Sequence, residues 1–118
     1  MPLEIEQTTL DSGVLILAAA GQMTMGNLLQ RFEWKIDELV KANEKKIVLD
    51  MAKIDYLDSS GLGVLVKCSA TVKNAGGQLK LAALTDRVAS VIKMVGLDGV
   101  LSICATKQEA IATFTAGA

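Results

Sequence analysis

The feature that most constrains the fold of this chain is a run of seven apolar side chains, Val14 to Ala20. A short continuous run of this kind is typical of a strand that other structure covers on both faces. Just before it, residues 3–9 alternate apolar and polar side chains as a half-buried strand does, and residues 11–13 have turn chemistry. These segments predict an antiparallel hairpin that ends at Gly21.

After the hairpin, helical and strand patterns alternate along the chain. The helical patterns cover residues 27–43, 60–74, 86–94 and a C-terminal segment that starts after Thr106, and the strand patterns cover residues 46–51, 78–84 and 100–104. Strands that alternate with helices over short connections form βα units with right-handed crossovers. The predicted fold is therefore α/β, with a mixed, mainly parallel sheet of about five strands, an N-terminal hairpin and about four helices.

A few side chains in these patterns carry specific expectations. Thr24 is predicted to cap the helix that begins at Asn27. Thr106 and Glu109 have the spacing of a capping box at the start of the last helix. Val95 is predicted to face the core at the end of the third helix.

Length and composition narrow the class of protein. At 118 residues the chain is predicted to form a single domain, 1–118. The formal net charge of −1 argues against a nucleic-acid binder that relies on a general basic field. Because the longest apolar run falls well short of the roughly 20 residues of a membrane-spanning helix, we expect no membrane insertion. The first residues lack the basic segment of a secretory signal, so we expect a cytoplasmic protein.

The residue types also exclude several kinds of chemistry. The chain has no histidine, which excludes every histidine-based triad, proton shuttle or metal site. Cys68 and Cys104 lie far apart among apolar neighbours and are predicted to be buried thiols without a disulfide. We therefore expect neither a metal ion nor another cofactor.

Trp34 falls outside the apolar stripe of its predicted helix and shares the polar face of that helix. Two interpretations of this position stay open. The indole ring either contacts a partner or lies flat over neighbouring side chains.

The chemically distinctive segment is Asp58-Ser59-Ser60-Gly61, between the end of an apolar strand and the start of an apolar helix. Since the carboxyl ends of parallel strands form the functional edge of such a sheet, we expect this turn to lie on that edge. From the residues alone two interpretations remain. Either the aspartate and serines cap the helix, or the helix N-terminus, with its partial positive charge, accepts an anion such as phosphate.

The same segment argues against catalysis. Activation of a serine hydroxyl needs an adjacent base, and no motif supplies one in a chain without histidine. Gly61-x-Gly63 lacks the lysine of a phosphate-binding loop, which disfavours a nucleotide-binding or hydrolytic domain. We expect Gly61 and Gly63 instead to let the helix start lie close to a neighbouring backbone.

The segments IVLD at residues 47–50 and IDYLDSSGLGVL at residues 54–65 together resemble the signature of the STAS domain family. The resemblance is strongest to its small, free-standing anti-sigma factor antagonists, and it spans essentially the whole chain. It implies a non-enzymatic binding protein that acts by partner switching in transcription regulation. The implied partners are an anti-sigma factor that is also a serine kinase, and a phosphatase.

The resemblance also implies the site residues. The hydroxyl residue directly after the aspartate is the one that such a kinase phosphorylates, which carries over to Ser59, with Asp58 beside it and Ser60 supporting the helix start. The implied partner-binding residues are Thr24, Asp58, Ser59, Ser60, Gly61 and Leu62.

Thr24 departs from the family pattern, which has an acid at this position. The substitution leaves open a second interpretation, in which the chain is a STAS adaptor subunit of a sensory or lipid-transport complex and is not regulated through Ser59. The off-stripe Trp34 would also suit an adaptor.

Overall fold

The computed structural model describes residues 4–116, and the side chains of all of these except residues 27, 28, 115 and 116. The elements, in chain order, are β1 (Glu4–Thr9), β2 (Leu15–Met23), α1 (Asn27–Lys41), β3 (Lys46–Leu57), α2 (Ser59–Asn74), β4 (Gln78–Ala82), α3 (Asp86–Met94), β5 (Ser102–Cys104) and α4 (Lys107–Ala116). The five strands form one sheet in the order β1-β2-β3-β4-β5. β1 is antiparallel to β2 and the other pairs are parallel, which confirms the predicted fold class.

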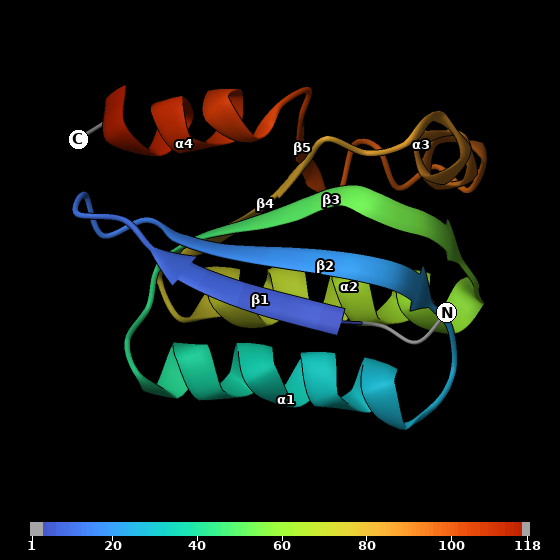
Figure 1. Cartoon of the computed structure of the whole chain (residues 1–118), viewed down its shortest axis with the longest axis horizontal. Helices are drawn as coiled ribbons and strands as arrows, with labels where there is room; N and C mark the ends of the chain where they lie inside the picture. Colours follow the sequence, from blue (N-terminus) through green and yellow to red (C-terminus); the bar gives the residue numbers. More distant parts are fainter. Residues whose placement is uncertain (1–3, 117–118) are drawn as a thin grey trace.

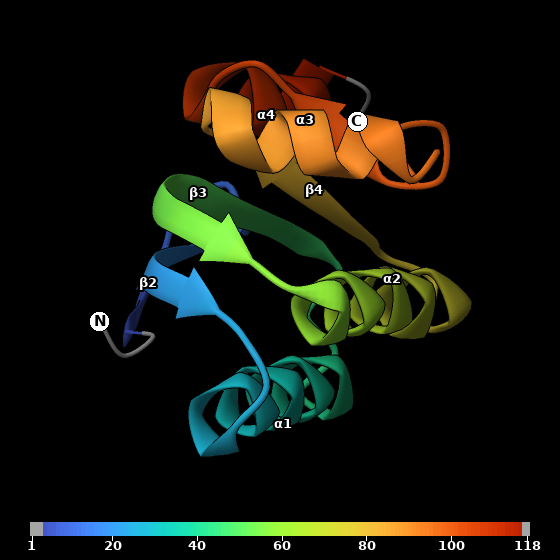
Figure 2. The ribbon, with the colours of Figure 1, turned by 90° about the vertical axis from the view of Figure 1, so that its right-hand side faces the viewer.

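Two helical layers cover the sheet. Figures 1 and 2 show α1 and α2 on one face and α3 and α4 on the other. Leu17 of β2 packs with Phe32 and Leu65 in the larger core, beneath α1 and α2. Ile16, one residue earlier, packs with Val48 in the smaller core on the opposite face. The apolar run is therefore buried on both faces, as its composition predicted.

β2 and β3 both run further than the predicted ends at Ala20 and Met51. Gly21 does not end the hairpin, because it lies inside β2 and pairs with Ile54, and Met23 pairs with Leu57. The buried residues near the end of β3 recur every third position, since register shifts in the β2–β3 pairing place two exposed residues between them. The end of β3 therefore lacks the alternation of apolar and polar residues from which a strand is predicted.

Two side-chain predictions were wrong. Thr24 does not cap α1, whose N-cap is Gly26 without a side-chain hydrogen bond. Val95 does not face the core, because α3 ends at Met94 and leaves the Val95 side chain 53% exposed. β4 and β5 are also shorter than predicted, and β4 gives way to Ala83, whose φ of 59° is incompatible with a strand.

Other local predictions were confirmed. The Thr106 hydroxyl oxygen accepts a hydrogen bond from the Glu109 N–H at 3.0 Å, which is the threonine half of the capping box. Cys68 and Cys104 are buried free thiols, and burial raises the pKa of Cys68 to about 12. Within residues 4–116, none of the helices has the combination of length and hydropathy that a bilayer crossing requires.

Truncation to alanine of the two aromatic residues of α1 should affect the stability of the fold to very different degrees. Phe32 is fully buried, so Phe32→Ala should lower the free energy of unfolding by about 3–5 kcal/mol. Trp34 is 58% exposed, so Trp34→Ala should change it by no more than about 0.5 kcal/mol. Urea denaturation followed by circular dichroism measures both values, and equal losses would contradict the burial of Phe32.

Two glycines near the start of α2 provide a second matched pair. A Cβ at Gly61 would lie 2.1 Å from the Met23 carbonyl oxygen at the end of β2, whereas a Cβ at Gly63 has no neighbour within 4 Å among the described residues. The expected close approach is thus confirmed for Gly61 and wrong for Gly63. Gly61→Ala should cost about 1–3 kcal/mol in unfolding free energy, since backbone must move. Gly63→Ala should stabilise by about 0.5–1 kcal/mol.

Measuring both glycine variants by the same urea titration separates crowding from helix propensity. Loss of stability in Gly63→Ala, or none in Gly61→Ala, would contradict this packing of α2 on β2.

Candidate regulatory site

Asp58 caps α2, and the helix begins at Ser59 rather than at the predicted Ser60. Its backbone is extended, with φ −102° and ψ −174°, and its Oδ1 accepts a hydrogen bond from the Gly61 N–H at 2.8 Å. Neither serine hydroxyl caps the helix, because the aspartate carboxylate occupies that role. Capping in this segment is therefore carried by Asp58 alone, which leaves the serine side chains available.

The second carboxylate oxygen of Asp58 joins α2 to the end of β2. Oδ2 accepts a hydrogen bond from the Met25 N–H at 3.0 Å, and the Asp58 N–H donates to the Met23 carbonyl oxygen at 3.2 Å. The β2–α1 and β3–α2 connections thus meet at the carboxyl ends of two neighbouring parallel strands. This confirms the prediction that the turn lies at the edge formed by the carboxyl ends of the parallel strands.

Hydrogen bonding sets the charge state of Asp58. The Gly61 N–H, followed by the Met25 N–H, holds the pKa of this carboxyl below its usual value of 3.8, although partial burial acts in the opposite direction. Donors that bind the charged form favour ionisation. The cap is therefore an anion at neutral pH, next to the partial positive charge of the helix N-terminus.

The structure brings the predicted site residues together with different degrees of exposure. Ser59 is exposed at the first position of α2, Ser60 is half-buried, and Leu62 is buried with 8% of its surface exposed. Thr24 is half-buried and lies between the two residues that hydrogen-bond with Asp58. Among the described residues, the Ser59 hydroxyl has no hydrogen-bond partner.

Two apolar side chains near this turn are exposed. Met25 is 79% exposed in the loop that Asp58 holds, and Tyr56, two residues before Asp58, is 42% exposed. The neighbours of Tyr56 in β3, Ile54 and Leu57, are buried, whereas Tyr56 points away from the core. The loop contact through the Met25 backbone has no signature in side-chain type, so no pattern could reveal it.

The arrangement suits binding and modification. A helix N-terminus tolerates an anion such as phosphate, and the exposed Ser59 hydroxyl stands there. Over residues 4–116, no group of three or more cysteine, aspartate or glutamate side chains is placed to hold a metal ion.

The carboxylate of Asp58 should make stability depend on pH. Because its pKa is lowered in the folded state, its stabilisation is complete above the usual value of 3.8 and is lost as the pH falls through the folded-state pKa. Asp58→Asn keeps an acceptor oxygen for only one of the two N–H groups, so it should cost stability at any pH, with about 1 kcal/mol more lost near pH 7 than at an acid pH below the folded-state pKa of Asp58. Urea midpoints at both pH values measure the difference.

Asp98→Asn is the matched control, since it removes the same charge at an exposed turn. The expected pattern is a pH-dependent loss for Asp58→Asn that the control lacks. An equal loss at both pH values would show that the charge of Asp58 adds nothing to the cap.

Comparison with known proteins agrees with this geometry. Residues 6–110 match the STAS domain family. A Thermotoga neapolitana protein, named as an anti-sigma factor antagonist homologue, is 30% identical over 98 residues, which are 83% of this chain and 87% of the relative. The crystal structure of a Thermotoga maritima protein named in the same group superposes with a TM-score of 0.83, at 26% identity and with 92% of each chain covered.

The anti-sigma factor antagonist SpoIIAA of Bacillus shares the fold at lower identity. Its unphosphorylated form gives a TM-score of 0.80 at 18% identity, with 96% of this chain and 97% of SpoIIAA covered. Its phosphorylated form gives 0.72 at 17% identity, with 94% and 99% covered. The sheet order, the capped turn and the family match point to one assignment. The chain belongs to the STAS domain family and is similar, within that family, to the anti-sigma factor antagonists.

Proposed function

We propose that this protein is a cytoplasmic anti-sigma factor antagonist that phosphorylation of Ser59 switches off. It acts by binding and not by catalysis: the unmodified form binds an anti-sigma factor that is also a serine kinase, the kinase phosphorylates Ser59, and a phosphatase restores binding. The observation that carries the proposal is the position of Ser59, which is exposed at the first residue of α2 and whose hydroxyl makes no hydrogen bond within the described chain.

The surface around Ser59 supports a docked partner. Met25 and Tyr56 expose apolar surface close to the capped turn, and Thr24 lies in the connection that Asp58 holds. Exposed apolar side chains beside a rigid polar turn are common at protein–protein contacts. The hydrogen bonds of Asp58 keep this surface in one shape before a partner arrives, which lowers the entropic cost of binding.

A phosphate on Ser59 would change this surface without unfolding the domain. It adds about −1.5 to −2 charges beside the ionised Asp58. The positive end of the α2 dipole partly offsets this charge, so the fold survives. A partner that covers the unmodified turn would instead meet added bulk, repulsion and the cost of desolvating a dianion. SpoIIAA, which has this fold and exists in phosphorylated and unphosphorylated forms, supports the idea that such a domain tolerates phosphate.

The alternative is a STAS adaptor subunit of a sensory or lipid-transport complex, for which Ser59 plays no regulatory part. Two observations favour it. Thr24 provides no charge where the family has an acid, and Trp34 of α1 is 58% exposed. An adaptor would use the Trp34 surface, and its binding would not respond to Ser59.

Binding of the cognate anti-sigma factor to three variants distinguishes these functions. Ser59→Ala should bind the anti-sigma factor like the wild type and resist phosphorylation, and Ser59→Asp should bind at least tenfold more weakly because of its charge. Ser60→Ala is the matched control and should still be phosphorylated, with the phosphate located by mass spectrometry. Wild-type affinity in Ser59→Asp together with no phosphate on Ser59 would refute the switch.

A further inference from the structure

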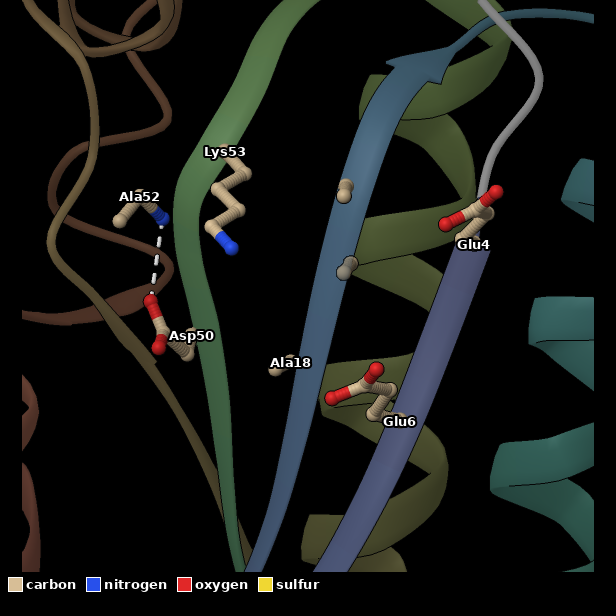
Figure 3. Close-up of a pocket in the computed structure, with 8 residues that line it drawn as sticks. Glu4, Glu6, Ala18, Asp50, Ala52 and Lys53 are labelled. Carbon is tan, nitrogen blue, oxygen red and sulfur yellow. Dashed lines mark hydrogen bonds between the residues drawn. The ribbon is translucent and has the colours of Figure 1, made fainter.

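A hollow of about 170 Å³ lies on the α3/α4 face of the sheet, over the part of β1, β2 and β3 that these helices leave open (Figure 3). Two neighbouring rungs of paired residues cross the three strands there: Glu6, Ala18 and Asp50, then Glu4, Ala20 and Lys53. The floor of the hollow is made of alanine side chains, and charged side chains stand on both sides of it.

The helical layer ends where these alanines begin. One rung earlier on the same face, Ile16 and Val48 are buried together with Ala110 of α4. Ala18 and Ala20 continue the β2 row but are partly exposed. Their methyl groups are too small to fill the space, so another surface could approach the strands closely here.

The charges on the two sides of the hollow differ in sign. Glu4 and Glu6 rise from β1, and Lys53 rises from β3, as Figure 3 shows. None of these three forms an ion pair within residues 4–116. Asp50 is already compensated, because its Oδ1 accepts the Ala52 N–H at 3.1 Å and its Oδ2 lies 3.9 Å from Lys107 Nζ. The hollow therefore has two unpaired carboxylates on its β1 wall and, on its β3 wall, an unpaired Lys53 beside the paired Asp50.

We propose that this hollow is the contact surface of a weak symmetric dimer of the chain itself. A twofold axis along β2, between two copies that face each other, sets the β1 wall of each copy against the β3 wall of the other. Lys53 of one copy then faces Glu4 of the second, and the same pair forms again across the axis. The alanine floors allow the two sheets to approach to about 10 Å, the ordinary spacing of packed sheets.

The charge pattern favours a second copy over other occupants. Lys53 would repel a purely basic segment, and Glu4 and Glu6 would repel a purely acidic one. A surface with both signs on opposite walls is complementary to its own twofold mate. Glu6 also faces Asp50 twice across the axis, and Lys107 beside each aspartate offsets part of this like-charge repulsion. Since eight residues line the hollow, against the roughly 20–30 per side of a stable interface, we expect weak association.

Sedimentation velocity of the full chain tests the proposal with a charge exchange. The wild type should shift from monomer to dimer between about 10 μM and about 1 mM, and added salt should weaken the dimer. Glu4→Lys and Lys53→Glu should each stay monomeric, since each homodimer would set like charges together twice. An equimolar mixture of the two variants should dimerise again, because both cross-pairs then have opposite signs.

Gln7→Lys, on the other face of β1, and Lys41→Glu, at the end of α1, are the matched controls and should dimerise like the wild type. Circular dichroism verifies that every variant is folded. A monomeric wild type at the highest concentration would overturn the proposal. So would a dimer that Glu4→Lys leaves intact, or a mixture of the two exchange variants that stays monomeric. Because Ser59 lies outside the hollow, these outcomes are independent of the phosphorylation proposal.

Discussion

The two hydrogen bonds accepted by the Asp58 carboxylate are the interactions on which the candidate site depends. One oxygen caps α2 through the Gly61 N–H, and the other holds the β2–α1 connection through the Met25 N–H. Two loops that are more than 30 residues apart in the chain are thereby fixed to each other at the edge of the sheet. The close contact of Gly61 with the Met23 carbonyl allows this approach, since any side chain at residue 61 would push the helix away.

This arrangement separates the residue that holds the turn from the residue that would be modified. Asp58 uses both oxygens within the fold, whereas the adjacent Ser59 side chain is exposed and bonds to nothing in the described chain. In the proposed switch, phosphorylation therefore changes what a partner meets without removing a contact that the fold needs. Phosphorylation of a serine that capped the helix would lower the stability of the fold, because its hydroxyl would already accept a hydrogen bond from the backbone.

The two faces of β2 explain both the stability of the domain and the proposed dimer. Leucines on one face and Val14 and Ile16 on the other are buried under helices. Further along the α3/α4 face of the same strand, Ala18 and Ala20 are only partly buried, and charged residues of β1 and β3 border the opening. A single strand thus supplies the centre of the core and, further along, the floor of an open surface.

Much of this protein was determined by local pattern. The apolar run Val14 to Ala20 and the alternation of helices and strands predicted the mixed, mainly parallel sheet, because a strand with no polar face needs a layer on each side. The Asp58-Ser59 segment marked the site through the chemistry of helix caps and the family resemblance. These features depend on residue type and spacing, which are fully visible in the chain.

Other features were decided only by the tertiary structure, because they depend on contacts between distant segments. The extension of β2 to Met23 and β3 to Leu57 comes from their mutual pairing and its register shifts. That pairing brings the Met25 backbone to Asp58 and leaves Thr24 without the capping role expected of it. Residue patterns report which face of an element is apolar. They do not report which backbone N–H of a remote loop a carboxylate will bind, since only the packed sheet sets that distance.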